Sequence, residues 1–183
     1  ENAALFAESG GRSTIHSDSA IAIQRLNQDA AKAMASGRAA GISITEDQAL
    51  NHVFGYAVAL DMTRRDLQKQ LSAKGSPWDV GKGFDHSAPC ATIHTASSGG
   101  HPASGPIRLS VNGEVKQDSD LRQMIWNVPQ IIVHLSRLFD LQAGDLILTG
   151  TPAGVGPVQP GDVLVGEIDT LGTLTIRIDA PCA

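Results

Sequence analysis

The sequence predicts an α+β fold that is rich in mixed β-sheet. Its second half contains three short β-rich runs, at 146–148, 163–168 and 174–178, which alternate with glycine turns. The Asn112-Gly113 pair predicts a β-hairpin, because a type I′ turn needs positive φ at both central positions. The strands are not spaced by regular helices, as a doubly wound parallel sheet would require. We therefore expect helices and mixed sheet in one compact body.

The length and composition are those of one globular domain. The chain has 183 residues, of which 42% are hydrophobic and 18% charged, and we treat residues 1–183 as a single domain. Aromatic residues make up 4% and the net charge is -5, which argues against a surface for nucleic acid. No apolar run approaches the roughly 20 residues that span a bilayer. We expect neither nucleic acid nor a membrane as a partner.

The cysteines and the start of the chain bear on location and completeness. Cys90 and Cys182 form neither a CxxC pair nor a Cys/His cluster, which indicates a reducing compartment. The N-terminus lacks the charged and then apolar pattern of a signal peptide, so we expect a cytoplasmic protein. The chain begins at Glu1 without an initiator methionine, and we expect the N-terminal part of the domain to be incomplete.

The N-terminal quarter has the weakest pattern. Residues 1–44 are rich in alanine, serine and glycine and follow no sustained period of 2 or 3.6. The TEDQ run at 45–48 then has the form of a capping box, which predicts a short helix through about Val53. We expect Gly55 to end this helix.

A buried strand and a second helix follow. The run at 56–60 is mostly apolar and predicts a strand that delivers Asp61 at its end. Residues 63 to about 73 have a helical pattern, so Asp61 stands at a strand-to-helix junction. The glycines and prolines between 75 and 89 predict an ordered, irregular loop.

The longest apolar pattern comes after the hairpin, whose strands we place at 107–111 and 114–117. Asp118 or Ser119 can cap a helix there, and Pro129 should kink or divide that helix. The apolar stripe of this predicted helix consists of Leu121, Met124, Ile125, Val128, Ile132, Leu135 and Leu138.

Asp61 opens a dense group of charged and polar side chains. The segment GYAVALDMTRRDLQ contains Asp61, Arg64, Arg65, Asp66 and Gln68. One interpretation is a solvated helix start whose acids and bases pair on the surface. The other is a metal-binding carboxylate beside arginines that grip substrate carboxylates, since oxygen ligands suit Mg²⁺ or Mn²⁺. The local pattern leaves both open.

Two glycine-containing segments could hold a ligand. Lys82 stands between two glycines in GKGFDHSAP, either near a ligand or as an idle lysine on a surface turn. TGTPAGVG lacks the Lys-Ser/Thr pair of a phosphate loop, and Pro152 removes an amide donor. A tight turn that holds Thr151 toward a ligand fits better. Neither HExxH nor GxSxG occurs, which gives little support to a zincin or an α/β-hydrolase.

The order of the motifs is more specific than any single motif. The chain contains GYAVALDMTRRDLQ, GKGFDHSAP, VNGEVKQ, MIW and LQAGDLILTGTPAGVGPVQPGD in this order. Together they closely resemble the fumarylacetoacetate hydrolase family over residues 45–178. The first two are most similar to the bacterial branch that includes the fumarylpyruvate hydrolases of gentisate breakdown, a route of aromatic compound catabolism. The resemblance implies a mixed β-sheet roll of this family's C-terminal-domain type and a homodimer.

The resemblance also implies roles for individual residues. Asp61 corresponds to a metal-binding aspartate, and the implied cofactor is a divalent metal, Mg²⁺ or Mn²⁺. Lys82 corresponds to the active-site lysine and is the candidate catalytic residue. Arg65 and Gln68 match substrate-facing residues of their helix. Thr151 matches the threonine that contacts the substrate carboxylate.

The N-terminal quarter departs from the family pattern. The metal site of the family also needs an ExE motif, in a window that corresponds to residues 26–32. Asp29 is the only carboxylate there, and we assign it to the metal. Because Mg²⁺ demands a full octahedral set of oxygen ligands, either the site is degenerate or these residues are misassigned. The catalytic histidine of the family would precede Glu1, so no general base is assigned.

The implied reaction is hydrolysis of a carbon–carbon bond in a 2,4-diketo acid, such as fumarylpyruvate or another acylpyruvate. A metal would polarise the 2-oxo group, water would attack the distal carbonyl, and Lys82 would help to hold the departing pyruvate enolate. Alternatives on the same fold are decarboxylation of oxaloacetate and isomerisation of a hydroxymuconate. The missing glutamates favour a further alternative, an inactive homologue that serves as a binding subunit.

Overall fold

The computed structural model describes residues 4–5, 15–17, 19–25 and 43–180. The strands are β1 (Ala4–Leu5), β2 (Ile15–Ser17), β3 (Ser19–Arg25), β4 (Val53–Leu60), β5 (Thr63–Arg64), β6 (His94–Thr95), β7 (Pro106–Val111), β8 (Glu114–Asp120), β9 (Leu146–Leu148), β10 (Gly156–Val158), β11 (Val163–Ile168) and β12 (Gly172–Ile178). The helices are α2 (Glu46–Ala49), α3 (Arg65–Ala73), α4 (Ala96–Gly99) and α5 (Val128–Ser136), with 3₁₀ turns η1 (Leu50–His52), η2 (Asp79–Gly81) and η3 (Leu121–Gln123).

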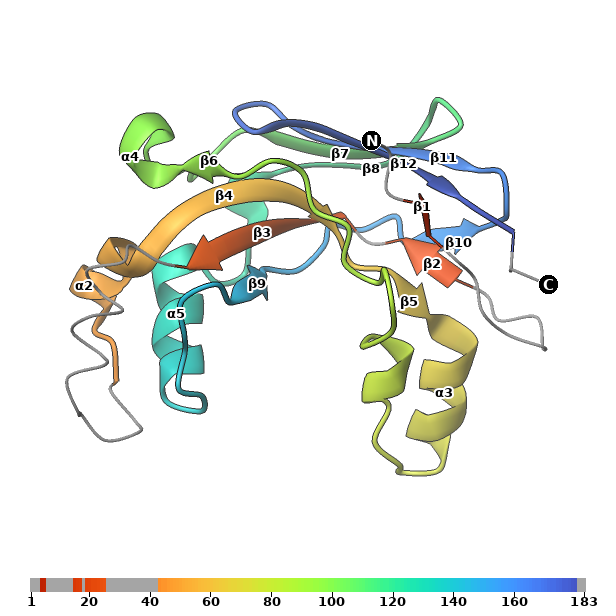
Figure 1. Cartoon of the computed structure of the whole chain (residues 1–183), viewed down its shortest axis with the longest axis horizontal. Helices are drawn as coiled ribbons and strands as arrows, with labels where there is room; N and C mark the ends of the chain where they lie inside the picture. Colours follow the sequence, from red (N-terminus) through yellow and green to blue (C-terminus); the bar gives the residue numbers. More distant parts are fainter. Residues whose placement is uncertain (1–3, 6–14, 18, 26–42, 181–183) are drawn as a thin grey trace.

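The described strands form three sheets, which confirms the α+β, sheet-rich prediction. Their orders are β1-β12-β11-β7-β8, β6-β4-β3-β9 and β10-β2-β5. The β1–β12 pair is parallel, whereas the other described pairs are antiparallel, so the first sheet is mixed. In Figure 1 the five-stranded sheet lies over the curved β4, and α3 and α5 extend below it as two separate arms.

Strand β4 runs through the core, as the apolar run at 56–60 predicts. All of its residues except Phe54 are buried, and both of its edges are paired, with β3 and with β6. Leu60 belongs to the same buried cluster as Leu164 of β11. At Gly166 of β11 a Cβ would lie 3.3 Å from the side chains of Leu60 and Val58, so glycine lets the two sheets approach closely.

The helix predicted from the TEDQ run is confirmed as α2, which η1 extends. The backbone rather than the Thr45 hydroxyl forms its first turn, because the N–H of Gln48 donates to the Thr45 carbonyl at 3.1 Å. The prediction that Gly55 ends the helix is wrong. Gly55 lies inside β4, where a Cβ would come within 2.4 Å of the carbonyl oxygen of His94. The glycine is needed because β6 passes close to β4.

The Asn112-Gly113 hairpin is confirmed. These two residues join β7 to β8 with φ angles of 52° and 82°, the positive values that the turn requires. The helix predicted after the hairpin is only partly correct, because β8 continues to Asp120 and leaves Asp118 and Ser119 within the strand. Asp120 caps η3 instead, since its side chain accepts from the Arg122 N–H.

Helix α5 begins later than the predicted helix. Asn127 is its N-cap in a complete capping box with Gln130, and Pro129 lies in the first turn, where it starts the helix rather than kinking it. The predicted apolar stripe therefore breaks in two. Ile132 is fully buried, but Ile125 precedes the helix and its side chain is 95% exposed.

The remaining predicted elements agree with the structure. The helix at 63–73 is α3, although Thr63 and Arg64 belong to β5, and the irregular loop at 75–89 contains only the short turn η2. The three C-terminal runs are β9, β11 and β12, and β10 was not predicted. Among the described helices, none has the length and apolar character to cross a membrane.

We expect Gly55→Ala to destabilise the fold by about 1 to 3 kcal/mol, because the new methyl group would meet a backbone carbonyl that cannot rotate away. Urea unfolding at equilibrium measures this. Gly99→Ala is the matched control, since no described atom lies within 4 Å of a Cβ built there. Equal urea midpoints for the two variants would show that β4 and β6 separate at no cost.

Candidate active site

Asp61 is held in the short link between β4 and β5. On one side of it the Leu60 N–H donates to the Pro89 carbonyl at 3.0 Å, and on the other the Met62 N–H donates to the Ser87 carbonyl at 2.8 Å. The end of the 75–89 loop is thus tied to the backbone on both sides of Asp61. The carboxylate of Asp61 is 31% exposed, so it faces solvent from a fixed backbone.

Lys82 reaches Asp61 from this loop. Its Nζ donates to Oδ2 of Asp61 at 2.6 Å, and its side chain is 28% exposed. The structure therefore brings together the two residues that the sequence proposes for catalysis and metal binding. A pair with this much solvent contact contributes little to stability. Its effect is to hold the Lys82 ammonium beside Asp61 at the end of β4.

The glycine before Lys82 lets the loop approach α3. The N–H of Lys82 donates to the Asp79 carbonyl at 2.8 Å and closes η2. At Gly81 a Cβ would lie 3.1 Å from the Cβ of Gln68, so a larger residue would push the turn away from the helix. Packing against α3 therefore explains why the first residue of the GKG sequence, Gly81, is a glycine.

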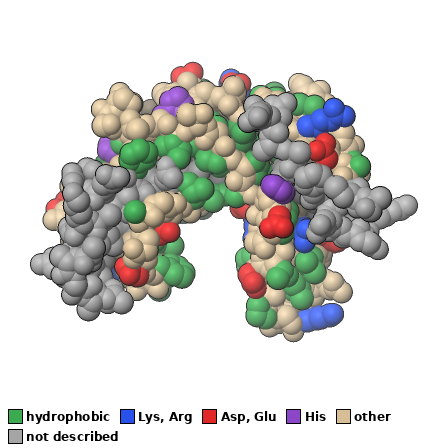
Figure 2. Space-filling view, in the orientation of Figure 1, with side chains coloured by type: hydrophobic (Ala, Val, Ile, Leu, Met, Phe, Trp, Pro, Cys, Tyr) green, Lys and Arg blue, Asp and Glu red, His purple; other side chains and the backbone are tan. Residues whose placement is uncertain are grey.

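Arg65 and Gln68 lie in the first turn of α3, next to this loop. Both are half-buried, and Nη1 of Arg65 donates to Oε1 of Gln68 at 2.7 Å. Nearby, the guanidinium of Arg64 lies over the ring of Phe84, with the Arg64 Cζ 4.4 Å from the ring centroid. In the space-filling view the molecule is hollowed below the curved sheet, and charged side chains gather where α3 joins the sheet, at the rim of this hollow (Figure 2).

Thr151 comes to the same end of the sheet as Asp61 but does not touch it in the described contacts. Leu148, the last residue of β9, pairs with Ala22 of β3, which in turn pairs with Ala57 of β4. Because β4 and β9 both run antiparallel to β3, they point the same way. The residues after each strand, Asp61 and Thr151, therefore leave the sheet at one end with β3 between them.

Thr151 is held by Gln117, a residue for which the sequence predicts no role in the site. Gln117 of β8 is 1% exposed, and its Nε2 donates to Oγ1 of Thr151 at 2.9 Å and to the carbonyl oxygen of Pro152 at 2.7 Å. The VNGEVKQ motif contains this glutamine, but its spacing from Thr151 in the sequence gives no sign of the contact. Thr151 lies in the link between β9 and β10, and a tight turn around it stays a prediction.

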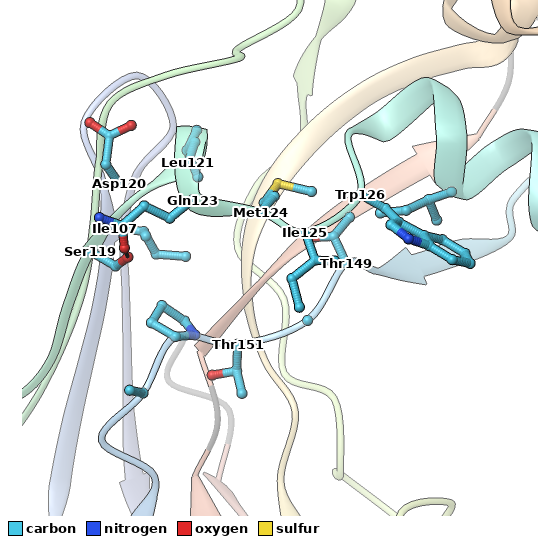
Figure 3. Close-up of a pocket in the computed structure, with 14 residues that line it drawn as sticks. Ile107, Ser119, Asp120, Leu121, Gln123, Met124, Ile125, Trp126, Thr149 and Thr151 are labelled. Atoms are coloured by element: carbon cyan, nitrogen blue, oxygen red, sulfur yellow. Dashed lines mark hydrogen bonds between the residues drawn. The ribbon is translucent and has the colours of Figure 1, made fainter.

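A pocket of about 530 Å³ opens beside Thr151 (Figure 3). Its walls come from the 119–126 segment and from the turn at 149–153, with Ile107 and Ile131 behind. Most of these side chains are apolar. Asp61 and Lys82 are not among its lining residues, so the pocket adjoins the Thr151 part of the site rather than the ion pair.

Of the two predicted metal ligands, Asp61 lies in the described part of the chain. Among the described residues, no three His, Cys, Asp or Glu side chains come close enough to hold an ion. Asp61 offers carboxylate oxygens of the kind that Mg²⁺ and Mn²⁺ prefer. Asp29, the second predicted ligand, lies outside the described residues. The described side chains therefore fit one ligand position and do not complete a site.

The most buried polar aromatic residue serves the core instead. The Tyr56 hydroxyl is 2.6 Å from Nδ1 of His101, and the two rings meet edge to face. Burial raises the pKa of the Tyr56 phenol well above its usual value. The phenol is therefore neutral at physiological pH and holds the loop of His101 against β4.

The chain matches one protein family over most of its length. Residues 10–179 match the model of the fumarylacetoacetate hydrolase C-terminal family. This range includes Asp61, Lys82 and Thr151. The chain belongs to the fumarylacetoacetate hydrolase family, and the resemblance of its motifs is confirmed.

Two relatives show the range of activities in this family. The chain is 44% identical to a fumarylpyruvate hydrolase from a Ralstonia species over 138 residues, which cover 75% of this chain and 71% of that protein. It is 38% identical to the mitochondrial oxaloacetate tautomerase of Homo sapiens over 139 residues, which cover 76% of this chain and 63% of that protein. The matches thus span about two thirds of the length of these relatives.

A solved structure agrees with the fold. The fumarylpyruvate hydrolase of Pseudomonas aeruginosa, in complex with Mn²⁺ and pyruvate, has a TM-score of 0.84 to this chain at 41% identity. The alignment covers 98% of this chain and 70% of that one. That protein therefore shares the fold described above, and its crystal contains a divalent metal and a 2-oxo acid.

Proposed function

We propose that this chain hydrolyses the C3–C4 bond of an acylpyruvate and releases pyruvate and a carboxylic acid. The observation that carries the proposal is the contact between Lys82 and Asp61 at the end of β4, in a chain similar to fumarylpyruvate hydrolases. Fumarylpyruvate is the proposed substrate, because these relatives are named for it. The products fit a role in aromatic compound catabolism.

Substrate binding would use the carboxylates of the diketo acid. The Thr151 hydroxyl can donate to the carboxylate of the pyruvyl part. Arg65 can grip carboxylate oxygens with its planar guanidinium, which donates two parallel hydrogen bonds. Gln68 holds this guanidinium in place through the 2.7 Å contact of its Oε1. The three side chains would fix the substrate across the end of the sheet.

The chemical step places negative charge near Lys82. Water adds to the C4 carbonyl carbon, the C3–C4 bond breaks, and its electron pair moves onto the 2-oxo oxygen to form an enolate. A proton then returns to C3 and gives pyruvate. The Lys82 ammonium is a fixed positive charge for the enolate oxygen, and stabilisation of developing charge often contributes more to catalysis than any other effect. Asp61 orients Lys82 before the substrate arrives.

We also propose that Asp61 is one ligand of a divalent ion, Mg²⁺ or Mn²⁺. The Mn²⁺ in the crystal of the Pseudomonas aeruginosa relative supports this proposal. When bound, the ion would act as a Lewis acid on the 2-oxo group. The roles proposed for Lys82, Arg65 and Thr151 do not depend on the geometry of the ion.

Oxaloacetate tautomerisation is the second candidate function. The similarity to the tautomerase of Homo sapiens favours it. It needs the same enolate-stabilising charge, but a proton moves between carbon and oxygen and no carbon–carbon bond breaks. Two assays separate the functions. A hydrolase releases free pyruvate from an acylpyruvate, whereas a tautomerase speeds the loss of the enol form of oxaloacetate.

We expect Lys82→Ala to lower kcat for fumarylpyruvate hydrolysis by about 10² to 10³-fold, with a smaller change in KM. The ammonium interacts more strongly with the enolate-like transition state than with the bound ketone, and loss of one such group has this effect in oxyanion holes. Loss of the diketo-acid absorbance, with Mg²⁺ or Mn²⁺ added, measures both constants.

Lys74→Ala is the matched control for this experiment, because Lys74 is exposed at the end of α3 and its substitution removes the same charge elsewhere. A rise in KM alone for Lys82→Ala would mean that Lys82 only binds substrate. A wild-type chain that cleaves no acylpyruvate would contradict the proposed hydrolysis and favour the tautomerase or an inactive subunit.

We expect Asp61→Ala to abolish binding of Mn²⁺, since it removes the described carboxylate at the proposed site. Isothermal calorimetry of the chain with Mn²⁺ and with Mg²⁺ tests this. Asp66→Ala is the control, because Asp66 is exposed in the first turn of α3 and its substitution removes one acid from the same segment. Unchanged Mn²⁺ affinity in Asp61→Ala would contradict the assignment of Asp61 as a metal ligand.

We propose a homodimer in which the segment 124–139 takes part. Its side chains Ile125, Trp126, Leu138 and Phe139 are large, apolar and 95%, 47%, 63% and 61% exposed. Burying such side chains in an isologous contact is favourable. Sedimentation velocity at micromolar concentration should give a dimer, and Ile125→Asp should weaken it. A monomeric wild type would count against this proposal.

A further inference from the structure

Gln117 is a buried amide in an otherwise accessible strand. It is 1% exposed, whereas the other residues of β8 are exposed or half-buried. A buried amide is costly unless its polar atoms are hydrogen-bonded. Gln117 uses its Nε2 group on a segment that lies more than thirty positions later, at Thr151 and Pro152. Its burial is therefore tied to the turn that contains Thr151.

A β-bulge turns Gln117 toward this segment. The hairpin pairs Ser110 with Val115, but the next pair is Leu109 with Gln117, so Lys116 is the extra residue. Without the bulge Lys116 would lie opposite Leu109. Paired residues point to the same face of a sheet, and Leu109 is buried, so the bulge places Gln117 on the buried face.

The backbone of the segment after Thr151 packs against the bulge. Gly154 has a φ of 104°, and a Cβ built on it would overlap the carbonyl oxygen of Lys116. The end of the turn thus packs directly on the extra residue of β8. The bulge backbone packs on Gly154, and the Gln117 side chain makes two hydrogen bonds, so β8 fixes the segment from Thr151 to Gly154.

The directions of the two hydrogen bonds follow from chemistry. The Pro152 carbonyl oxygen can only accept, so the amide atom of Gln117 that faces it must be the nitrogen Nε2 and not the oxygen. The same nitrogen can only donate to Thr151 Oγ1. Thr151 therefore accepts from Gln117, and its own hydroxyl hydrogen is not used in this contact.

We propose that Gln117 is a positioning residue that makes Thr151 a hydrogen-bond donor to the substrate carboxylate. This inference rests on the proposed function, in which Thr151 binds the pyruvyl carboxylate. By donating a hydrogen bond to Oγ1, the amide directs the Thr151 hydrogen away from β8 and toward the ligand. Hydrogen bonds to a charged acceptor are stronger than neutral ones, so the orientation is worth fixing in advance.

A double-mutant cycle on pyruvate affinity tests the role of Gln117. Gln117→Leu, Thr151→Val and the double variant are titrated with pyruvate in the presence of Mn²⁺ by calorimetry. We expect Gln117→Leu to weaken pyruvate binding about tenfold, and to have no further effect once Thr151 is valine. Gln117 then acts through Thr151. Equal losses in both backgrounds would overturn the proposal, because a general structural defect does not depend on the Thr151 hydroxyl.

Gln117→Met gives a second test if the leucine variant does not fold. It keeps an unbranched side chain of similar length, but its thioether donates no hydrogen bond to Thr151. We expect it also to weaken pyruvate binding, with the loss again absent in the Thr151→Val background. Pyruvate affinity that stays unchanged in Gln117→Met would overturn the proposal. Val115→Ala is the control, since Val115 is exposed on the other face of β8.

The outcomes separate this inference from the proposed function. If the wild type binds pyruvate and the Gln117 and Thr151 substitutions are coupled, but no acylpyruvate is cleaved, the proposed hydrolysis is contradicted and the role of Gln117 is supported. If the wild type cleaves acylpyruvates but the two substitutions are additive, the proposed hydrolysis is supported and the role of Gln117 is contradicted. A wild type that neither binds pyruvate nor turns over an acylpyruvate would overturn both.

Discussion

The site depends on the burial of β4. Both edges of this strand are paired, and Gly166 lets β11 pack closely across it. Both faces of β4 are buried, but Tyr56 and Val58 pack on one face whereas Ala57 and Ala59 lie on the other. A shift by one residue would exchange large and small side chains, so packing fixes the register. Asp61 follows directly and inherits a fixed position. The 75–89 loop is then tied to the backbone on either side of Asp61, which brings Lys82 within hydrogen-bond distance of the carboxylate.

The sheet also sets the distance between the two parts of the site. Asp61 follows β4, and Thr151 comes after β9, with β3 between these strands. Neighbouring strands are about 4.8 Å apart, so the two chain segments leave the sheet roughly 10 Å from each other. In the proposed function these segments would contact neighbouring groups of the substrate, the carboxylate through Thr151 and the 2-oxo oxygen through Lys82, so their side chains would have to bridge this gap. The apolar pocket beside Thr151 lies beyond it and adds room on that side.

Local patterns predicted the elements whose cause is local. The apolar run of β4, the Asn112-Gly113 turn and the α3 pattern all agree with the structure. The failures have causes distant in sequence. Gly55 is set by the approach of His94, and the 118–138 pattern misleads because β8 pairs with β7 as far as Asp120. In the candidate site, the motifs single out Asp61 and Lys82, which the structure brings into contact, but the bulge that turns Gln117 inward appears only in three dimensions.

The two parts of the site are supported by interactions of different strength. The Lys82–Asp61 pair is partly exposed, and pairs of this kind are worth about 0 to 1 kcal/mol. In the proposed hydrolysis, Lys82 would therefore exchange Asp61 for the enolate oxygen at small cost when charge appears there. Thr151 is instead held through a buried amide, whose loss of a partner would cost its desolvation. In the proposed function Thr151 would be a firmly held anchor for the carboxylate and Lys82 a cation that can change partners, which suits a reaction in which the carboxylate keeps its charge and the 2-oxo oxygen gains one.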